Sequence, residues 1–137
     1  MGKKDSDETS LVVYRSQIEF PVVPLSGNPF FTCIVTKSNI KSPFQLVIPR
    51  SFQDYLPPTT VPTTLFCRNG IWELNYFGDK GRLKRFDQGW KTFALENDLK
   101  IGDACVFELL QSGEDLLIFA VQILDGTVPI FSIVVDE

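Results

Sequence analysis

Two short segments of the sequence carry side chains that could contact a polyanion. The candidate residues are Lys37, Ser38, Asn39 and Lys41 in "TKSNIKS" (36–42) and Lys80, Arg82, Lys84 and Arg85 in "GDKGRLKR" (78–85). Lys and Arg neutralise phosphates, while Arg can bond guanine and Asn can bond adenine through paired hydrogen bonds. A two-stranded β ribbon, which the second segment could form, fits the major groove of DNA. These residue types favour contact with double-stranded DNA.

Two other interpretations of the basic segments remain open at this point. A run of charge is often a solvated face, so both segments could simply be solubilising loops. The stretch "KGRLKR" (80–85) is also of the kind that nuclear-import receptors read, although a hairpin would hold it away from the extended form that such a peptide needs.

The charge of the chain is divided along its length. Residues 37–85 hold eight basic and three acidic side chains, a net +5, whereas residues 86–137 hold two basic and ten acidic ones, a net −8. The whole chain is at −4, so a weak net charge coexists with a strong local field, and local field steers a charged ligand. We expect the acidic half to face away from a bound nucleic acid or to dock another protein.

Residues for enzymatic chemistry are scarce. The sequence has no histidine, and its turn glycines lack the Lys-Ser/Thr that follows a phosphate-binding loop. The adjacent Glu114 and Asp115 read as a solvated hairpin tip, and Cys33, Cys67 and Cys105 read as single reduced thiols. We therefore expect no enzyme activity, no cofactor, no metal site and no small-molecule substrate. No apolar run approaches the length of a membrane span, so no membrane association is expected either.

The elements that would position the basic segments are mostly strands. Strands are expected over 30–36, 44–49, 71–77, 104–110 and 116–124, with another beginning at "LFCR" (65–68). Short helices are expected over 49–56 and 87–99, the second with Asp87 as its cap and Trp90, Phe93 and Ala94 on one face. Turn glycines predict hairpins over 71–86 and 104–124. Strands so apolar favour a closed or curled sheet, which hides their edges.

A series of motifs after the first strand resembles the plant B3 DNA-binding domain superfamily. The motifs are "FQLVIPRSF" (44–52), Trp72, "GWKTF" (89–93), Asn97 with Leu99, "GD" (102–103), Phe107 with Leu109, and Phe119 with Val121 and Ile123. Their order and spacing agree with the family over residues 28–124. The residue pattern of "VTKSNIKSPFQLVIPRSF" (35–52) most resembles the reproductive-meristem class of that family.

The resemblance implies a fold and a set of boundaries. The fold is a seven-stranded open pseudobarrel with two short α-helices. Outside the family pattern, 11–20 and 128–135 are candidates for extra N- and C-terminal strands that extend it. Residues 1–27 would form a tail, 28–124 the domain, and 125–137 a C-terminal extension. Trp90, Phe93, Phe107, Phe119 and Ile48 would form the core.

The resemblance also implies a function. Two arms, here 36–43 and 77–85, would enter the major groove of DNA for a nuclear transcription regulator that binds specific sequences. Arg82, Lys84 and Asn39 would read bases, and Lys37, Lys41, Lys80 and Arg85 would hold phosphates. The alternative is a protein-interaction or homodimerisation module of the same fold, with weak or non-specific DNA binding, acting through the acidic face or the extra strands.

Overall fold

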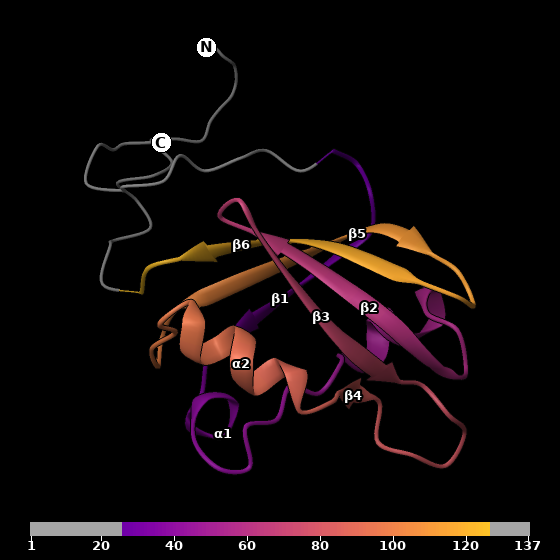
Figure 1. Cartoon of the computed structure of the whole chain (residues 1–137), viewed down its shortest axis with the longest axis horizontal. Helices are drawn as coiled ribbons and strands as arrows, with labels where there is room; N and C mark the ends of the chain where they lie inside the picture. The colour runs from indigo at the N-terminus through magenta and orange to yellow at the C-terminus, as the bar shows by residue number, and fades with distance from the viewer. Residues whose placement is uncertain (1–25, 127–137) are drawn as a thin grey trace.

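The computed structural model describes residues 26–126. In chain order the elements are β1 (Phe30–Ile34), α1 (Lys37–Ile40), the 3₁₀ helix η1 (Arg50–Tyr55), β2 (Thr60–Cys67), β3 (Gly70–Phe77), β4 (Arg85–Phe86), α2 (Gly89–Glu96), β5 (Ala104–Ser112) and β6 (Leu117–Leu124). The strands form one sheet in the order β1-β5-β6-β2-β3-β4. Figure 1 shows this sheet curled around one side of the molecule, with α2 lying across it.

All neighbouring strands but one pair run antiparallel. The exception is β2 with β6, whose parallel register runs from Thr63 opposite Leu117 to Phe66 opposite Ala120. This crossover joins the two halves of the sheet, and β1 and β4 remain as its edges. The mainly β, open and curled architecture predicted from the sequence is confirmed.

Two strand predictions differ from the structure in detail. The strand expected over 44–49 is reduced to an isolated bridge between Val47 and Arg85, so the described residues form six strands in the sheet. Phe44 has a φ of 54°, outside the extended region, which prevents a regular strand from beginning there. Conversely, β2 begins at Thr60, ahead of the strand that the sequence predicted to begin at Leu65. Its Pro62 is tolerated because pairing with β6 starts only at Thr63.

The core is built largely from aromatic rings. Trp90, Phe93, Phe107, Phe119 and Ile48 are all buried, as the sequence predicted. The rings of Phe31 and Phe107 stack at 4.6 Å between centroids, and those of Trp90 and Phe93 stack at 5.3 Å. Burying each such side chain contributes about 1.5–3 kcal/mol, so this cluster supplies much of the force that closes α2 onto the sheet.

The two predicted helices are present but shorter. The helix expected over 87–99 is α2, which buries Trp90, Phe93 and Ala94. Asp87 Oδ1 accepts a hydrogen bond from Gly89 N at 2.8 Å, and Asn97 Nδ2 donates to Phe93 O at 3.0 Å, so polar side chains satisfy both ends. The helix expected over 49–56 is η1, and α1 was expected only as a basic connection.

Other expectations concern the segments that flank the domain and the three cysteines in its strands. The extra strands expected at 11–20 and 128–135 lie outside the described residues. Cys67 and Cys105 are buried and Cys33 is half-buried, and all three are free thiols as predicted. Burial also raises the pKa of the Cys105 thiol far above its usual range. In residues 26–126 no helix has the length and apolar character that crossing a bilayer requires.

Candidate nucleic-acid interface

The first basic segment is a single helical turn held by an internal amide. Asn39 Oδ1 accepts hydrogen bonds from Thr36 N at 2.7 Å and from Thr36 Oγ1 at 3.1 Å. Asn39 Nδ2 donates to Gln45 O at 2.8 Å, which ties the turn to the chain that follows it. Lys37, Ser38 and Lys41 are left exposed on the outside of this turn.

Asn39 itself does not fit the base-reading role expected from the sequence. Its side chain is only 8% exposed, and both its amide atoms bond within the protein. In addition, its backbone oxygen accepts a hydrogen bond from Trp90 Nε1 at 2.9 Å. Asn39 therefore anchors α1 to α2 and to residue 45. An Asn between two lysines looks like a ligand-binding side chain in the sequence, where these contacts cannot be seen.

Replacement of Asn39 by alanine tests this anchoring role. The change leaves Thr36 N and Gln45 O without their partners, and we expect it to lower the free energy of unfolding by about 1–3 kcal/mol. Urea denaturation measures the loss. The matched control is Ser38→Ala in the same turn, where the side chain is exposed and a change within about 0.5 kcal/mol is expected. Equal stability of the two variants would contradict the assignment.

The second basic segment is a folded loop between β3 and β4 rather than a long ribbon. Only two register pairs join these strands, Tyr76 with Phe86 and Phe77 with Arg85. Gly78 N donates to Thr59 O at 3.0 Å, and a Cβ at Gly78 would collide with the backbone oxygen of Pro57. The segment 78–84 therefore needs glycine where it leaves the sheet.

Charged side chains fix the shape of this loop from within. Asp79 Oδ2 accepts hydrogen bonds from Thr60 Oγ1 at 2.5 Å and from Arg82 Nη1 at 3.4 Å. The Thr60 hydrogen bond first, and the Arg82 guanidinium second, hold the pKa of Asp79 below its usual value. Asp79 therefore stays ionised and keeps the start of the loop beside Arg82.

The ammonium group of Lys84 binds the backbone of its own loop. Its Nζ donates to Gly78 O at 2.8 Å and to Asp79 O at 3.2 Å, which uses two of the three ammonium donors. The side chain is half-buried. This geometry fits the base-reading role expected for Lys84 poorly, since the ammonium would have to give up both carbonyls to reach a base.

Two arginines share one aromatic ring at the rim of the loop. The guanidinium of Arg82 lies 4.1 Å from the centroid of the Phe77 ring, and that of Arg85 lies 4.9 Å from it. Such cation–π contacts restrict where the guanidiniums lie. Arg82 Nη1 also donates to Asp79 and Arg85 Nη1 to Phe86 O at 3.3 Å, and each guanidinium carries further N–H donors. Arg82 is exposed and Arg85 is half-buried, so the pair presents a preorganised cationic edge.

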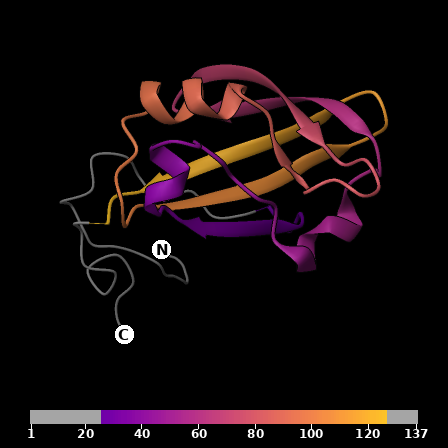
Figure 2. The same cartoon turned by 90° about the horizontal axis from the view of Figure 1, so that it is seen from below.

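The fold brings the two basic segments to one side of the molecule. Residues 45–48 connect them: Gln45 N donates to Ser38 O at 2.9 Å, and Ile48 N donates to Lys84 O at 2.9 Å. Both α1 and the loop before β4 lie along the lower edge in Figure 1 and face the reader in Figure 2. The sequence placed the segments about forty residues apart, and the Val47–Arg85 bridge unites them.

A further cation lies beside this edge and was missed by sequence reasoning. Lys91 Nζ is 5.0 Å from the centroid of the Phe44 ring, which links α2 to the connection after α1. The signal available in the sequence was its position between Trp90 and Phe93, on the exposed side of an amphipathic helix.

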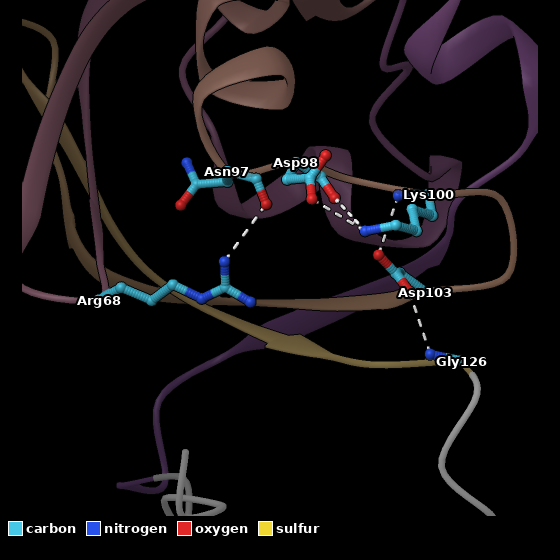
Figure 3. Close-up of polar contacts among 6 residues, drawn as sticks. All are labelled: Arg68, Asn97, Asp98, Lys100, Asp103 and Gly126. Carbon is cyan, nitrogen blue, oxygen red and sulfur yellow. Dashed lines mark hydrogen bonds and ion pairs between the residues drawn. The ribbon is translucent and has the colours of Figure 1, made fainter. Parts of the chain in front are cut away.

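The acidic residues after Phe86 lie on several elements of the fold and in the turns between them. Figure 3 shows one group, where Asp103 accepts from Lys100 N at 2.9 Å and Gly126 N at 3.0 Å. Asp103 is buried and closes the turn before β5. Asp98 pairs with Lys100 at 2.9 Å. Within residues 26–126 no cluster of three or more His, Cys, Asp or Glu residues could hold a metal ion.

Comparison with known proteins identifies the family. The B3 DNA binding domain family matches residues 30–123, which is well over half of the chain. The chain therefore belongs to the B3 DNA-binding domain family, as its motifs predicted.

Curated plant proteins resemble the chain over most of its length. It is 47% identical over 112 residues to B3 domain-containing protein Os04g0386900 of Oryza sativa subsp. japonica, covering 79% of this chain and 52% of that protein. It is 34% identical over 91 residues to B3 domain-containing transcription factor VRN1 of Arabidopsis thaliana, covering 66% and 26%. With B3 domain-containing protein REM23 of Arabidopsis thaliana the identity is 33% over 97 residues, covering 69% and 30%. The predicted likeness to the reproductive-meristem class is confirmed. The chain spans about half the length of the first relative and under a third of the other two.

A solved structure supports the fold. The structure of the hypothetical Arabidopsis thaliana protein At1g16640.1 superposes with a TM-score of 0.58 at 22% identity, covering 78% of this chain and all of that one. At this identity the likeness concerns the arrangement of strands and helices alone.

Proposed function

We propose that this chain binds double-stranded DNA in a sequence-specific manner, as the B3 domain of a nuclear plant transcription regulator. The observation that carries the proposal is the joining of two cationic segments along one edge of the sheet by residues 45–48. Family membership supports it independently. We infer that residues 28–124 form the DNA-binding unit.

The proposed contacts fall into two groups. Lys37, Ser38, Lys41, Lys80, Arg85 and Lys91 hold phosphates. Arg82 reads base edges, because its guanidinium is exposed and held in place by Phe77 and Asp79. A planar guanidinium offers the two parallel donors that guanine accepts in the major groove. Asn39 and Lys84 act as positioning residues for the turn and the loop that carry these contacts.

The salt dependence of binding tests the phosphate contacts. Five lysine and arginine side chains on phosphates predict a slope of log K against log salt of about −4 to −5. Lys80→Ala should reduce the slope by about 1, because it removes one phosphate contact without altering the fold. Fluorescence anisotropy of a labelled duplex between about 50 and 200 mM salt measures both values.

The matched control is Lys100→Ala. Lys100 is an exposed lysine paired with Asp98, outside both basic segments, so its removal should leave the slope unchanged. A flat response of the unaltered chain to salt would overturn the proposed function. A stable dimer that gives no DNA complex at low salt would instead favour the protein-interaction alternative.

Selection of bound duplexes from a random pool tests sequence specificity. We expect one enriched motif containing a guanine, whose replacement weakens binding of the unaltered chain more than that of Arg82→Ala. A pool without enrichment would be compatible with binding to phosphates but would contradict the proposed sequence specificity.

A further inference from the structure

One edge of the sheet has nothing paired along it among the described residues. The sheet ends at β1 and β4. The outer side of β4 is bridged, because its Arg85 pairs with Val47. β1 is the outermost strand at the other end, where Figure 2 shows it in indigo beside β5. β1 (Phe30–Ile34) contains no charged residue, no proline and no bulge, which are the usual devices that keep an edge strand from pairing.

The backbone groups of β1 point alternately toward β5 and toward this open edge. Leu109 N, on β5, donates to Pro29 O at 2.8 Å, so the odd-numbered residues of the segment bond to β5. The N–H and C=O groups of Phe30, Thr32 and Ile34 therefore point away from β5. No described residue bonds to these groups. The edge thus offers donors and acceptors along its whole length to a further strand.

The side chains of the same three residues are exposed. Phe30 is 50% exposed and Ile34 is 61% exposed, and Thr32 lies exposed between them. Phe31 points the other way into the core, where its ring stacks on Phe107. The exposed row therefore combines an aromatic ring, a hydroxyl and a β-branched side chain. Leaving the two large apolar side chains of this row in water forgoes the free energy of their burial.

This edge is complementary to itself. If a second copy pairs antiparallel about Thr32, each Thr32 faces Thr32 of the other copy, and each Phe30 faces Ile34 of the other copy. Every outward N–H and C=O group then has a partner, because facing residues in such pairs exchange two hydrogen bonds. Aromatic side chains with β-branched ones, and Thr with Thr, are favourable cross-strand pairs. No like charges face each other, since β1 carries none.

We propose that β1 is the interface of a homodimer, in which two copies of the chain pair antiparallel about Thr32 and join their sheets into one. The partner is a second copy because a two-fold axis through Thr32 satisfies the row without any other sequence. The seam has five residues a side, against about 20–30 in a standard interface, so we expect a weak dimer with a Kd on the order of 100 μM. The inference does not depend on DNA binding, because β1 carries none of the proposed contacts.

Sedimentation velocity of the full chain without DNA, between about 10 μM and about 1 mM, tests the proposal. The unaltered chain should shift from monomer toward dimer over this range. Thr32→Lys brings two like charges face to face and should weaken the dimer about tenfold or more. Thr32→Glu should do the same, whereas an equimolar mixture of the two variants should associate again, because opposite charges then face each other. Thr32 is exposed, so the melting temperatures of both variants should stay close to that of the unaltered chain.

Ile71→Lys supplies the matched control, because it adds the same charge at another exposed strand position. Ile71 is 60% exposed on β3, and three strands lie between β3 and β1, so this change should leave the dimer intact. A chain that stays monomeric up to about 1 mM would overturn the proposal, and so would a dimer that Thr32→Lys does not weaken. A dimer that Ile71→Lys also dissolves would place the contact on the face of the sheet instead of its edge. A mixture of the Lys and Glu variants that stays monomeric would contradict the facing of Thr32 with itself.

Discussion

Replacement of Arg82 and Arg85 together by alanine is expected to weaken specific DNA binding by roughly two orders of magnitude. Each arginine contact with a base edge or phosphate contributes about 1–3 kcal/mol, and 1.4 kcal/mol corresponds to a factor of ten. Both guanidiniums lie over Phe77, so little ordering is required when DNA binds. Stability should change little, because Arg82 is exposed and Arg85 pairs with Val47 through its backbone.

Anisotropy titrations of a selected duplex and a scrambled duplex, at one salt concentration, measure this effect. The double variant should lose more affinity for the selected duplex than for the scrambled one. Arg82→Lys is the informative companion, because it keeps the charge and loses the planar fork, so it should retain phosphate binding while losing discrimination. If the double variant kept both its affinity and its melting temperature, Arg82 and Arg85 would not be part of the interface.

Replacement of Trp90 by alanine is expected to have the largest effect on stability. Trp90 is fully buried, stacks with Phe93 and Phe86, and donates a hydrogen bond from Nε1 to Asn39 O. Truncating a buried aromatic of this size costs about 3–5 kcal/mol, out of a total stability of about 5–15 kcal/mol for a typical domain. The variant should therefore unfold at much lower urea concentration, and α1 should lose its anchor to α2.

Two variants separate the causes of this loss. Trp90→Phe keeps most of the ring packing but removes the Nε1 hydrogen bond, so it should lower the free energy of unfolding less and weaken DNA binding mainly through α1. Leu95→Ala, on the same helix but 58% exposed, should change stability little. If Trp90→Ala were no worse than Leu95→Ala in urea denaturation, the central place of Trp90 in the core would be wrong.

Much of the fold was predictable because it follows from local patterns. The hairpin of β5 and β6 was visible in alternating apolar residues on either side of a Gly-containing turn, and its register confirms that pattern. The amphipathic helix α2 was visible from the spacing of Trp90, Phe93 and Ala94. These signals survive because each element buries its own apolar face, whatever its neighbours are.

The candidate site was predictable in composition but not in the roles of its residues. The clustering of Lys and Arg was enough to identify both basic segments, since it can be read directly from the sequence. The charge pattern could not distinguish cations that face solvent from side chains that hydrogen-bond to the backbone. Asn39 and Lys84 donate hydrogen bonds to the backbone oxygens of Gln45 and Gly78, and no residue type in the sequence indicates these contacts. Lys91 joins the edge only because α2 packs beside Phe44.

Periodicity and composition of short stretches were enough to indicate a mainly β domain, the helix α2 and the two places where positive charge gathers. The order and spacing of motifs then indicated the family and the aromatic core. That the two cationic segments share an edge is visible only in the folded chain. That outcome rests on the parallel pairing of β2 with β6 and on the bridge between Val47 and Arg85. Such pairings join residues far apart in the chain. They are made by backbone hydrogen bonds, which do not require particular residue types and so cannot be read from the sequence.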